Sequence, residues 1–353
     1  MLSFCPEPIE DELLYGLVGR WFIQSGFKSW RKFLIAAFGT RPTLSSREVI
    51  VSLALRSAHA EVASTSLAAE QLTVLPFHRP LMKRSTYATF RTAASLKSLA
   101  SVRVSPITSG ATAAKDAYIQ FCPFCASEQR EKLGFATWLR SHNIPGVDMC
   151  LTHRSRLHNR TIPVQCASFF PVPTTGPKRY EYEFPDDDLL YSRRAFQVCT
   201  SNHEPIPIGV RHRVWRCAIQ AKYGQRRLDK RHSQLLEEDL MKHPKLLQRI
   251  WRCTSDPSPI HRLVEAFTKG LDRTESMREA IVLAEVLFED GVNGFLRDAV
   301  MSIGLNETED EDSLFPAMSS DFSCQVKRQR PRLIQQDTIS GHLRFQESLD
   351  EFT

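Results

Sequence analysis

Four residues near the middle of the chain have the types and the spacing of ligands for one metal ion. Cys122 and Cys125 form a C-x-x-C motif. Cys150 and His153 form a C-x-x-H motif, and residues 126–149 separate the two pairs. Two residues between ligands let one tight turn aim both side chains at the same ion, and three thiolates with one imidazole are a closed set typical of structural zinc. Thiolate-rich ligation also favours zinc over magnesium or calcium, so we predict one structural Zn²⁺ per chain.

The sequence leaves alternatives open around this site. His158 lies five residues after His153 and is a second candidate for the fourth ligand, although the tighter C-x-x-H spacing favours His153. His142 is predicted to be a hydrogen-bonding residue of the structure and not a ligand. Four buried side chains without a metal are the alternative to the zinc site as a whole. The residues between the pairs are apolar enough to build a small core on the metal: Leu133, Phe135, Trp138, Leu139, Ile144 and Val147.

A catalytic use of zinc is the competing chemistry. His59 and Glu61 form an H-x-E which, followed by a C-x-x-C, resembles the signature of zinc deaminases. The proline of that signature precedes the cysteine pair, whereas Pro123 lies inside the pair here, and residues 62–121 intervene. Four protein ligands would also leave no position for a catalytic water. Because the chain lacks the G-x-x-x-x-G-K-[ST] phosphate loop as well, we expect a binding protein and not an enzyme.

Residues 121–157 contain F-C-P-x-C, Gly134–Phe135, Trp138, the R-S-H-x-x-P-G-V run of Arg140–Val147, and C-x-x-H. These motifs resemble those of the TniQ/TnsD family. Upstream, Pro8–Leu14 resembles the proline, acidic and leucine opening of the family, and Leu75–Phe77 resembles a short family motif. The resemblance covers residues 5–160 well and the remainder only loosely.

Members of this family select target sites for multi-component cut-and-paste transposons, so the resemblance implies that function here. It implies double-stranded DNA and the transposon AAA+ ATPase (TnsC-like), which brings the transposase, as partners. A TniQ adaptor that docks on an RNA-guided CRISPR Cascade complex, often as a self-dimer, is the alternative within the family. The basic block at residues 211–231 narrowly favours direct DNA binding. Outside the family, a helical zinc-containing transcriptional regulator is the alternative.

The composition is that of a globular protein. Of the 353 residues, 42% are hydrophobic, and no apolar run approaches the roughly 20 residues of a membrane span. Nine cysteines without a second C-x-x-C indicate a reducing compartment and not a disulfide framework. The start of the sequence is acidic and does not resemble a secretory signal. We therefore expect a cytoplasmic bacterial protein that is associated with the nucleoid when on DNA.

The hydrophobic pattern predicts a mainly α-helical fold with a central Cys3His zinc module. The expected segments are an N-terminal helical domain for DNA or partner binding (1–115), the zinc module (116–160), a proline-rich linker (161–205), a second helical domain (206–301) and a disordered tail (302–353). The first helix is predicted over residues 10–23 with acidic residues in its first turn, and a second from Ser29 to Gly39. This pair is a candidate helix-turn-helix, with an ordinary helical hairpin as the alternative. Further helices are predicted over 45–55, 65–72 and 279–299.

Basic residues indicate where DNA could bind. Residues 71–114 contain no acidic residue, and residues 211–231 contain only Asp229. Such blocks can neutralise a phosphate backbone, although basic residues on a helix are often simply solvated. The candidate DNA-binding residues are Arg31, Lys32, Lys83, Arg84, Arg91, Arg211, Arg213, Arg216, Lys222, Arg226, Arg227 and Arg231.

Overall fold

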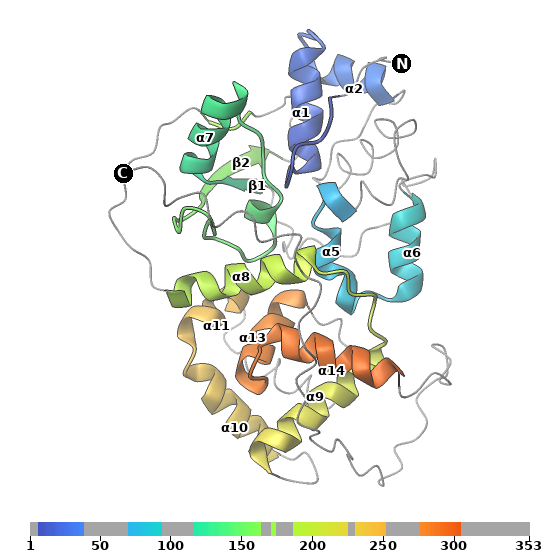
Figure 1. Ribbon diagram of the computed structural model, residues 1–353, viewed down its shortest axis with the longest axis vertical. Helices are drawn as coiled ribbons and strands as arrows, with labels where there is room; N and C mark the ends of the chain where they lie inside the picture. Colours follow the sequence, from blue (N-terminus) through green and yellow to red (C-terminus); the bar gives the residue numbers. More distant parts are fainter. Residues whose placement is uncertain are drawn as a thin grey trace, which may run out of the picture. The chain divides into compact units, whose positions relative to one another are not determined.

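The computed structural model describes residues 6–38, 70–93, 116–163, 171–173, 186–224, 230–251 and 276–304. All of them belong to the first of two units, Met1–Glu311 and Asp312–Thr353. This part is mainly helical, as predicted, with one antiparallel pair of strands (Figure 1). None of its helices combines the length and the apolar character that a membrane crossing requires. The helix predicted over 45–55 and residues 305–353 of the predicted tail lie outside the described residues. Residues 302–304, which were predicted as part of the disordered tail, are helical.

The first two helices are α1 (Leu14–Gln24) and α2 (Trp30–Phe38). They pack through aromatic side chains: the rings of Trp21 and Phe33 meet edge-on with centroids 5.3 Å apart. Gly26 has φ +71° in the turn between the helices, where a side chain would be strained. The predicted acidic first turn is wrong, because α1 begins after those residues and has no acidic residue in its first turn.

Two short helical segments follow, α5 (Leu75–His78) and η1 (Arg79–Leu81), and then α6 (Arg84–Ala93). The hydroxyl of Thr73 accepts a hydrogen bond of 3.0 Å from the amide of Leu75 at the start of α5. Phe77 is completely buried, and α5 contacts the later helix α8 (Asp186–Thr200). The short motif that resembles the TniQ/TnsD family is therefore a packing element.

The predicted zinc module contains the only strands of the described residues. β1 (Asp116–Phe121) pairs with β2 (His158–Pro163), so that Phe121 lies opposite His158. Helix α7 (Pro123–Leu133) follows β1 directly and ends at Gly134, whose φ is +80°, and the short η3 (Ser141–Asn143) comes later. Trp138, Ile144 and Val147 are buried as predicted, whereas Leu133 is 46% exposed. Leu133 therefore does not belong to the core that the sequence predicted.

The remaining helices form the C-terminal part: α8, α9 (Ile208–Tyr223), α10 (Lys230–Met241), α11 (Pro244–Trp251), α13 (Met277–Leu287) and α14 (Val292–Gly304). The ring of Trp215 stacks on Phe295 with centroids 4.2 Å apart, which joins α9 to α14. The single helix predicted over 279–299 is two helices, because the chain turns at Gly291 with φ +56°.

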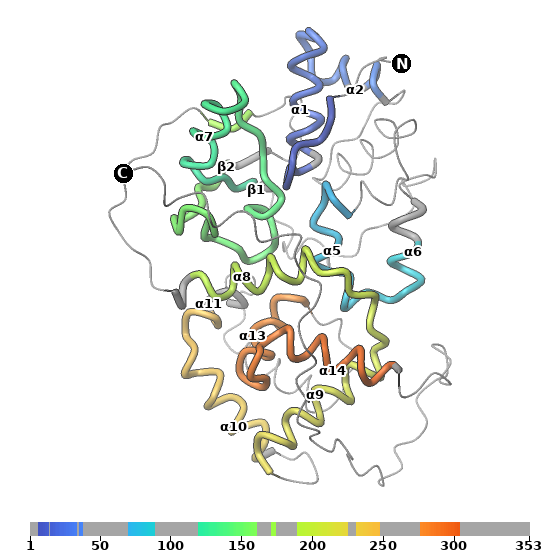
Figure 2. Tube along the Cα trace, in the orientation of Figure 1, coloured from blue at the N-terminus to red at the C-terminus, as the bar shows by residue number. Residues whose placement is uncertain are grey.

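Helix α8 lies inside the segment that was predicted as a linker. It contacts α5, α11, α13 and α14, and the chain trace in Figure 2 passes through it between β2 and α9. Its Tyr191 is 1% exposed, and the Tyr191 hydroxyl donates a hydrogen bond of 2.8 Å to the carbonyl of Pro145 in the predicted zinc module. One hydrophobic cluster accordingly includes Ile144 and Val147 together with residues of α8, α9, α10, α11, α13 and α14.

Candidate metal centre

The structure brings the four predicted ligands together. One pair lies at the start of a helix and the other on a hairpin. Cys122 lies between β1 and α7, and Cys125 lies in the first turn of α7, where Pro123 occupies a position suited to a helix start. The other pair lies on a tight hairpin. There the amide of Cys150 donates to the carbonyl of Ser155 at 2.8 Å, and the hairpin leads into β2. The amide of Ala126 donates to the carbonyl of Cys122 at 3.0 Å, so a backbone hydrogen bond helps to position each pair.

The donor atoms have the separations of a tetrahedral site. Nδ1 of His153 lies 3.2 Å from Sγ of Cys125 and 3.7 Å from Sγ of both Cys122 and Cys150. The sulfurs of Cys125 and Cys150 are 3.6 Å apart. Ordinary zinc–ligand bonds correspond to about 3.8 Å between two sulfurs and about 3.6 Å between sulfur and nitrogen. All four donor atoms lie within 4.8 Å of one another, so the four residues could hold one metal ion.

The electrostatics of the cluster also suit a cation. The adjacent sulfurs of Cys122 and Cys150, together with burial, raise the pKa of the Cys125 thiol. Hydrogen bonds to Cys122 and Cys150 raise the pKa of His153 to about 11. Thiolates at this distance repel one another unless positive charge lies between them. A divalent ion would supply that charge, because metal binding and thiol deprotonation are coupled.

Two other histidines near the site are not part of the Cys3His cluster. His158 lies on β2, where its ring packs against Phe121 with centroids 5.7 Å apart. His142 is buried, and burial lowers its pKa to about 4. Its Nε2 lies 3.7 Å from Sγ of Cys125, and the cluster that could hold a metal does not include His142.

The N-terminal opening motif is attached to the same module through a buried carboxylate. Glu12 is completely buried and receives hydrogen bonds from Arg20 at 2.7 and 2.8 Å. The hydroxyl of Thr137 donates to Glu12 at 2.6 Å, and the amide of Ile9 at 3.1 Å. The backbone of Glu12 also forms an isolated β-bridge with Leu139. The acidic residue that the sequence suggested for a helix dipole is therefore an internal anchor for residues 137–139.

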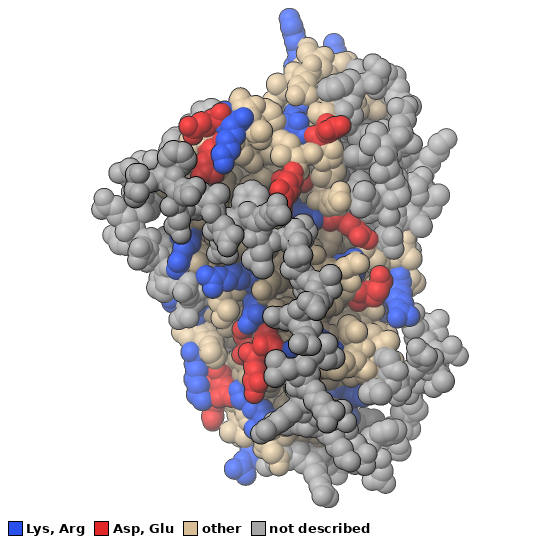
Figure 3. Space-filling model, viewed as in Figure 1, with Lys and Arg blue, Asp and Glu red and all other residues tan. Residues whose placement is uncertain are grey.

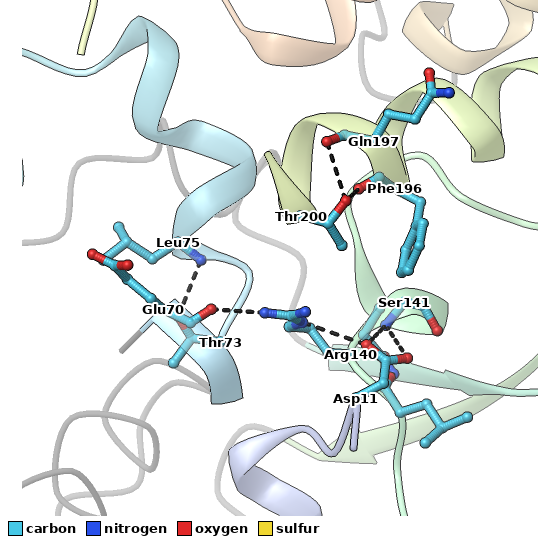
Figure 4. Close-up of polar contacts among 11 residues, drawn as sticks. Asp11, Glu70, Thr73, Leu75, Arg140, Ser141, Phe196, Gln197 and Thr200 are labelled. Atoms are coloured by element: carbon cyan, nitrogen blue, oxygen red, sulfur yellow. Dashed lines mark hydrogen bonds and ion pairs between the residues drawn. The ribbon is translucent and has the colours of Figure 1, made fainter. Parts of the chain in front are cut away.

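A second polar contact joins the opening motif to the segment before α5. The guanidinium of Arg140 reaches Asp11 at 3.4 Å on one side and the carbonyl of Glu70 at 2.7 Å on the other (Figure 4). Asp11 has a left-handed φ of +56°, and its carboxylate accepts from the amide of Ser141. Burial raises the pKa of Asp11 despite these partners. Arg140 thus joins the opening motif to the segment before α5.

A comparison with protein families finds a match for the region that contains these contacts. Residues 3–157 match the TniQ family model. This matched region, which is less than half of the chain, is a TniQ domain. The matched region contains the Glu12 anchor, the α5 motif and all four residues of the candidate metal cluster. A TniQ domain associates this region with transposition. No curated protein matches the chain.

The predicted DNA-binding residues differ in their surroundings. Arg31, Lys32, Lys83 and Arg84 are exposed on α2 and at the start of α6. The side chain of Arg91 and all of residues 225–229, which include Arg226 and Arg227, lie outside the description. The structure therefore does not test whether Arg91, Arg226 and Arg227 share a surface with the four exposed residues.

The basic residues of helix α9 lie on different faces of the helix. Val214, Trp215 and Ile219 are buried as the sequence predicted, whereas Arg213 and Arg216 are exposed. Arg211 is only 6% exposed, so it does not share that surface. The ammonium of Lys222 lies 2.8 Å from Asp239 and donates to the carbonyl of Val286. Arg231 is exposed at the start of α10.

Proposed function

We propose that this TniQ-domain protein is a zinc-containing selector of DNA target sites for a cut-and-paste transposon, and that it acts by binding and not by catalysis. It would contact double-stranded DNA and recruit the transposon AAA+ ATPase, which brings the transposase. The observation that carries this proposal is the TniQ match over residues 3–157. The closed Cys3His set, which leaves no position for a reacting water, supports a structural role for the ion.

The surface of α9 supports direct DNA binding. Arg213 and Arg216 lie three residues apart, so they are neighbours on one side of the helix, and the opposite side is buried in the core. Exposed arginines on a firmly packed helix suit phosphate contacts, because arginine keeps its charge and little backbone freedom is lost on binding. On the face drawn in Figure 3, basic and acidic side chains are interspersed, so the proposal rests on these residues and not on a general basic surface.

A salt series on duplex DNA tests the proposed contacts. We expect the double variant Arg213→Gln, Arg216→Gln to bind more weakly and to lose about 0.9 of the log–log salt slope for each phosphate contact removed. The folding stability should change little, because both side chains are exposed. Lys132→Gln with Arg297→Gln is the matched control, since it removes the same charge from exposed positions on α7 and α14.

DNA contact by α9 would be contradicted if both double variants had the same DNA affinity and the same salt slope as the wild type. An equal loss in both would indicate a general effect of net charge and would also count against α9 as the interface. Undetectable binding by the wild-type protein at low salt would contradict direct DNA selection and favour an adaptor that docks on a guide complex.

A further inference from the structure

Each ligand of the metal centre has a second partner that the cysteine and histidine spacing does not reveal. Sγ of Cys122 lies 3.3 Å from the hydroxyl of Ser155, and Sγ of Cys125 lies 3.7 Å from His142. The backbone amide of His153 donates to Sγ of Cys150 at 3.4 Å. Hydrogen-bond donors of this kind disperse the negative charge of metal-bound thiolates.

The partner of His153 is a carboxylate. While Nδ1 of the imidazole faces the three sulfurs, Nε2 on the opposite side of the ring lies 2.8 Å from Oε1 of Glu128. The ring also stacks on Phe124 with centroids 5.5 Å apart. Phe124 and Glu128 belong to α7, which also carries the ligand Cys125. One helix therefore supplies a ligand, a surface for the imidazole ring and an acceptor for its outer nitrogen.

This arrangement determines which form of the imidazole the site holds. A metal ion on Nδ1 requires the proton of neutral imidazole to be on Nε2, and a carboxylate next to Nε2 stabilises that tautomer. We propose that Glu128 is a positioning residue of the metal centre, which holds His153 with Nδ1 toward the ion and accepts the Nε2 proton in a hydrogen bond. The inference rests on metal binding by the four-residue cluster.

Zinc affinity is the first test. We expect Glu128→Ala to raise the zinc dissociation constant 10- to 100-fold, which is typical for removal of an outer partner of a ligand. Glu131→Ala is the matched control, because Glu131 is an exposed glutamate on the same helix outside the metal cluster, and it should stay within about two-fold of the wild type. Glu128→Gln keeps an acceptor oxygen without the charge, so we expect an intermediate value. Each dissociation constant would be measured by competition with a chromophoric chelator.

Nitrogen NMR of the His153 ring separates positioning from a general structural effect. In the zinc-loaded wild-type protein we expect one metal-bound nitrogen, Nδ1, and one protonated nitrogen, Nε2. In Glu128→Ala the Nε2 resonance should move, while in Glu131→Ala it should not.

Three outcomes would overturn the proposal. The first is a Glu128→Ala protein with wild-type zinc affinity and an unchanged Nε2 resonance. The second is a zinc-loaded wild-type protein whose His153 carries protons on both nitrogens. Such a ring cannot bind the metal, and its contact with Glu128 would be an ordinary ion pair. A wild-type protein that binds no metal would overturn both this inference and the proposed zinc centre, whereas the DNA-binding proposal would keep its own test.

Discussion

Replacement of Cys150 by serine is expected to abolish metal binding and to unfold the region from β1 to β2. Structural zinc sites contribute apparent binding free energies of about 10–16 kcal/mol in small finger domains, and this energy is coupled to folding. Cys150 is 1% exposed and belongs to the same hydrophobic cluster as the C-terminal helices. The loss should therefore lower the cooperative unfolding temperature of the described part of the first unit. Elemental analysis and a thermal melt, each with and without a strong chelator, measure the two effects.

Cys217→Ser is the control for this experiment. Cys217 is a half-buried cysteine on α9 outside the ligand cluster, and its replacement should leave one zinc per chain. If the Cys150→Ser protein kept its zinc and its melting temperature, the fourth ligand would have to be another residue. If the well-folded wild-type protein contained no zinc, the proposed cofactor would be wrong.

Replacement of Arg20 by methionine is the second change with a large expected effect. It would leave the carboxylate of Glu12 without its ionic partner in a place where Glu12 is 0% and Arg20 only 11% exposed. Breaking a buried ion pair from one side costs about 3–5 kcal/mol, because a desolvated charge stays behind. The guanidinium also lies 5.2 Å from the centre of the Phe135 ring, a contact that methionine would reproduce only in part. Denaturant unfolding monitored by tryptophan fluorescence would give the change in free energy.

An exposed ion pair of the same chain provides the comparison. Arg297 and Asp290 lie 2.7 Å apart with side chains 59% and 57% exposed, so Arg297→Met should cost less than about 1 kcal/mol. Addition of Glu12→Gln to the Arg20→Met protein should recover part of the loss, because the amide removes the charge and keeps an oxygen for Thr137. Equal costs at the two pairs would show that burial of Glu12 is not the source of the effect.

The sequence was sufficient for those features that depend on short spacing. The C-x-x-C and C-x-x-H pairs occur on two local turns, and each turn needs only its own few residues. The buried face of α9 was predicted for a similar reason, since Val214, Trp215 and Ile219 follow the helical repeat. In both cases neighbouring residues contain the information.

Features that depend on distant partners were missed or misassigned. Glu12 was interpreted as a helix-dipole residue because acidic residues before a leucine-rich segment are typical of helix starts. Its actual environment depends on Thr137, which is 125 positions away. No sequence pattern pointed to Glu128, because its proposed role depends on its contact with Nε2 of His153, which only the folded structure shows. Helix α8 was not predicted, because the proline-rich residues before it favoured a linker.

The contact of Tyr191 with Pro145 has a consequence for any attempt to cut this protein into parts. Gly146 has φ +85°, and a Cβ at this position would lie 2.6 Å from the Tyr191 hydroxyl, so the backbone of the metal module and α8 touch without space for an added methyl group. A fragment truncated after residue 160 would lose α8 and would expose Ile144 and Val147, which the helices cover in the intact chain. Residues 116–160 are therefore not an independent structural unit, and their transfer into another protein would have to include α8.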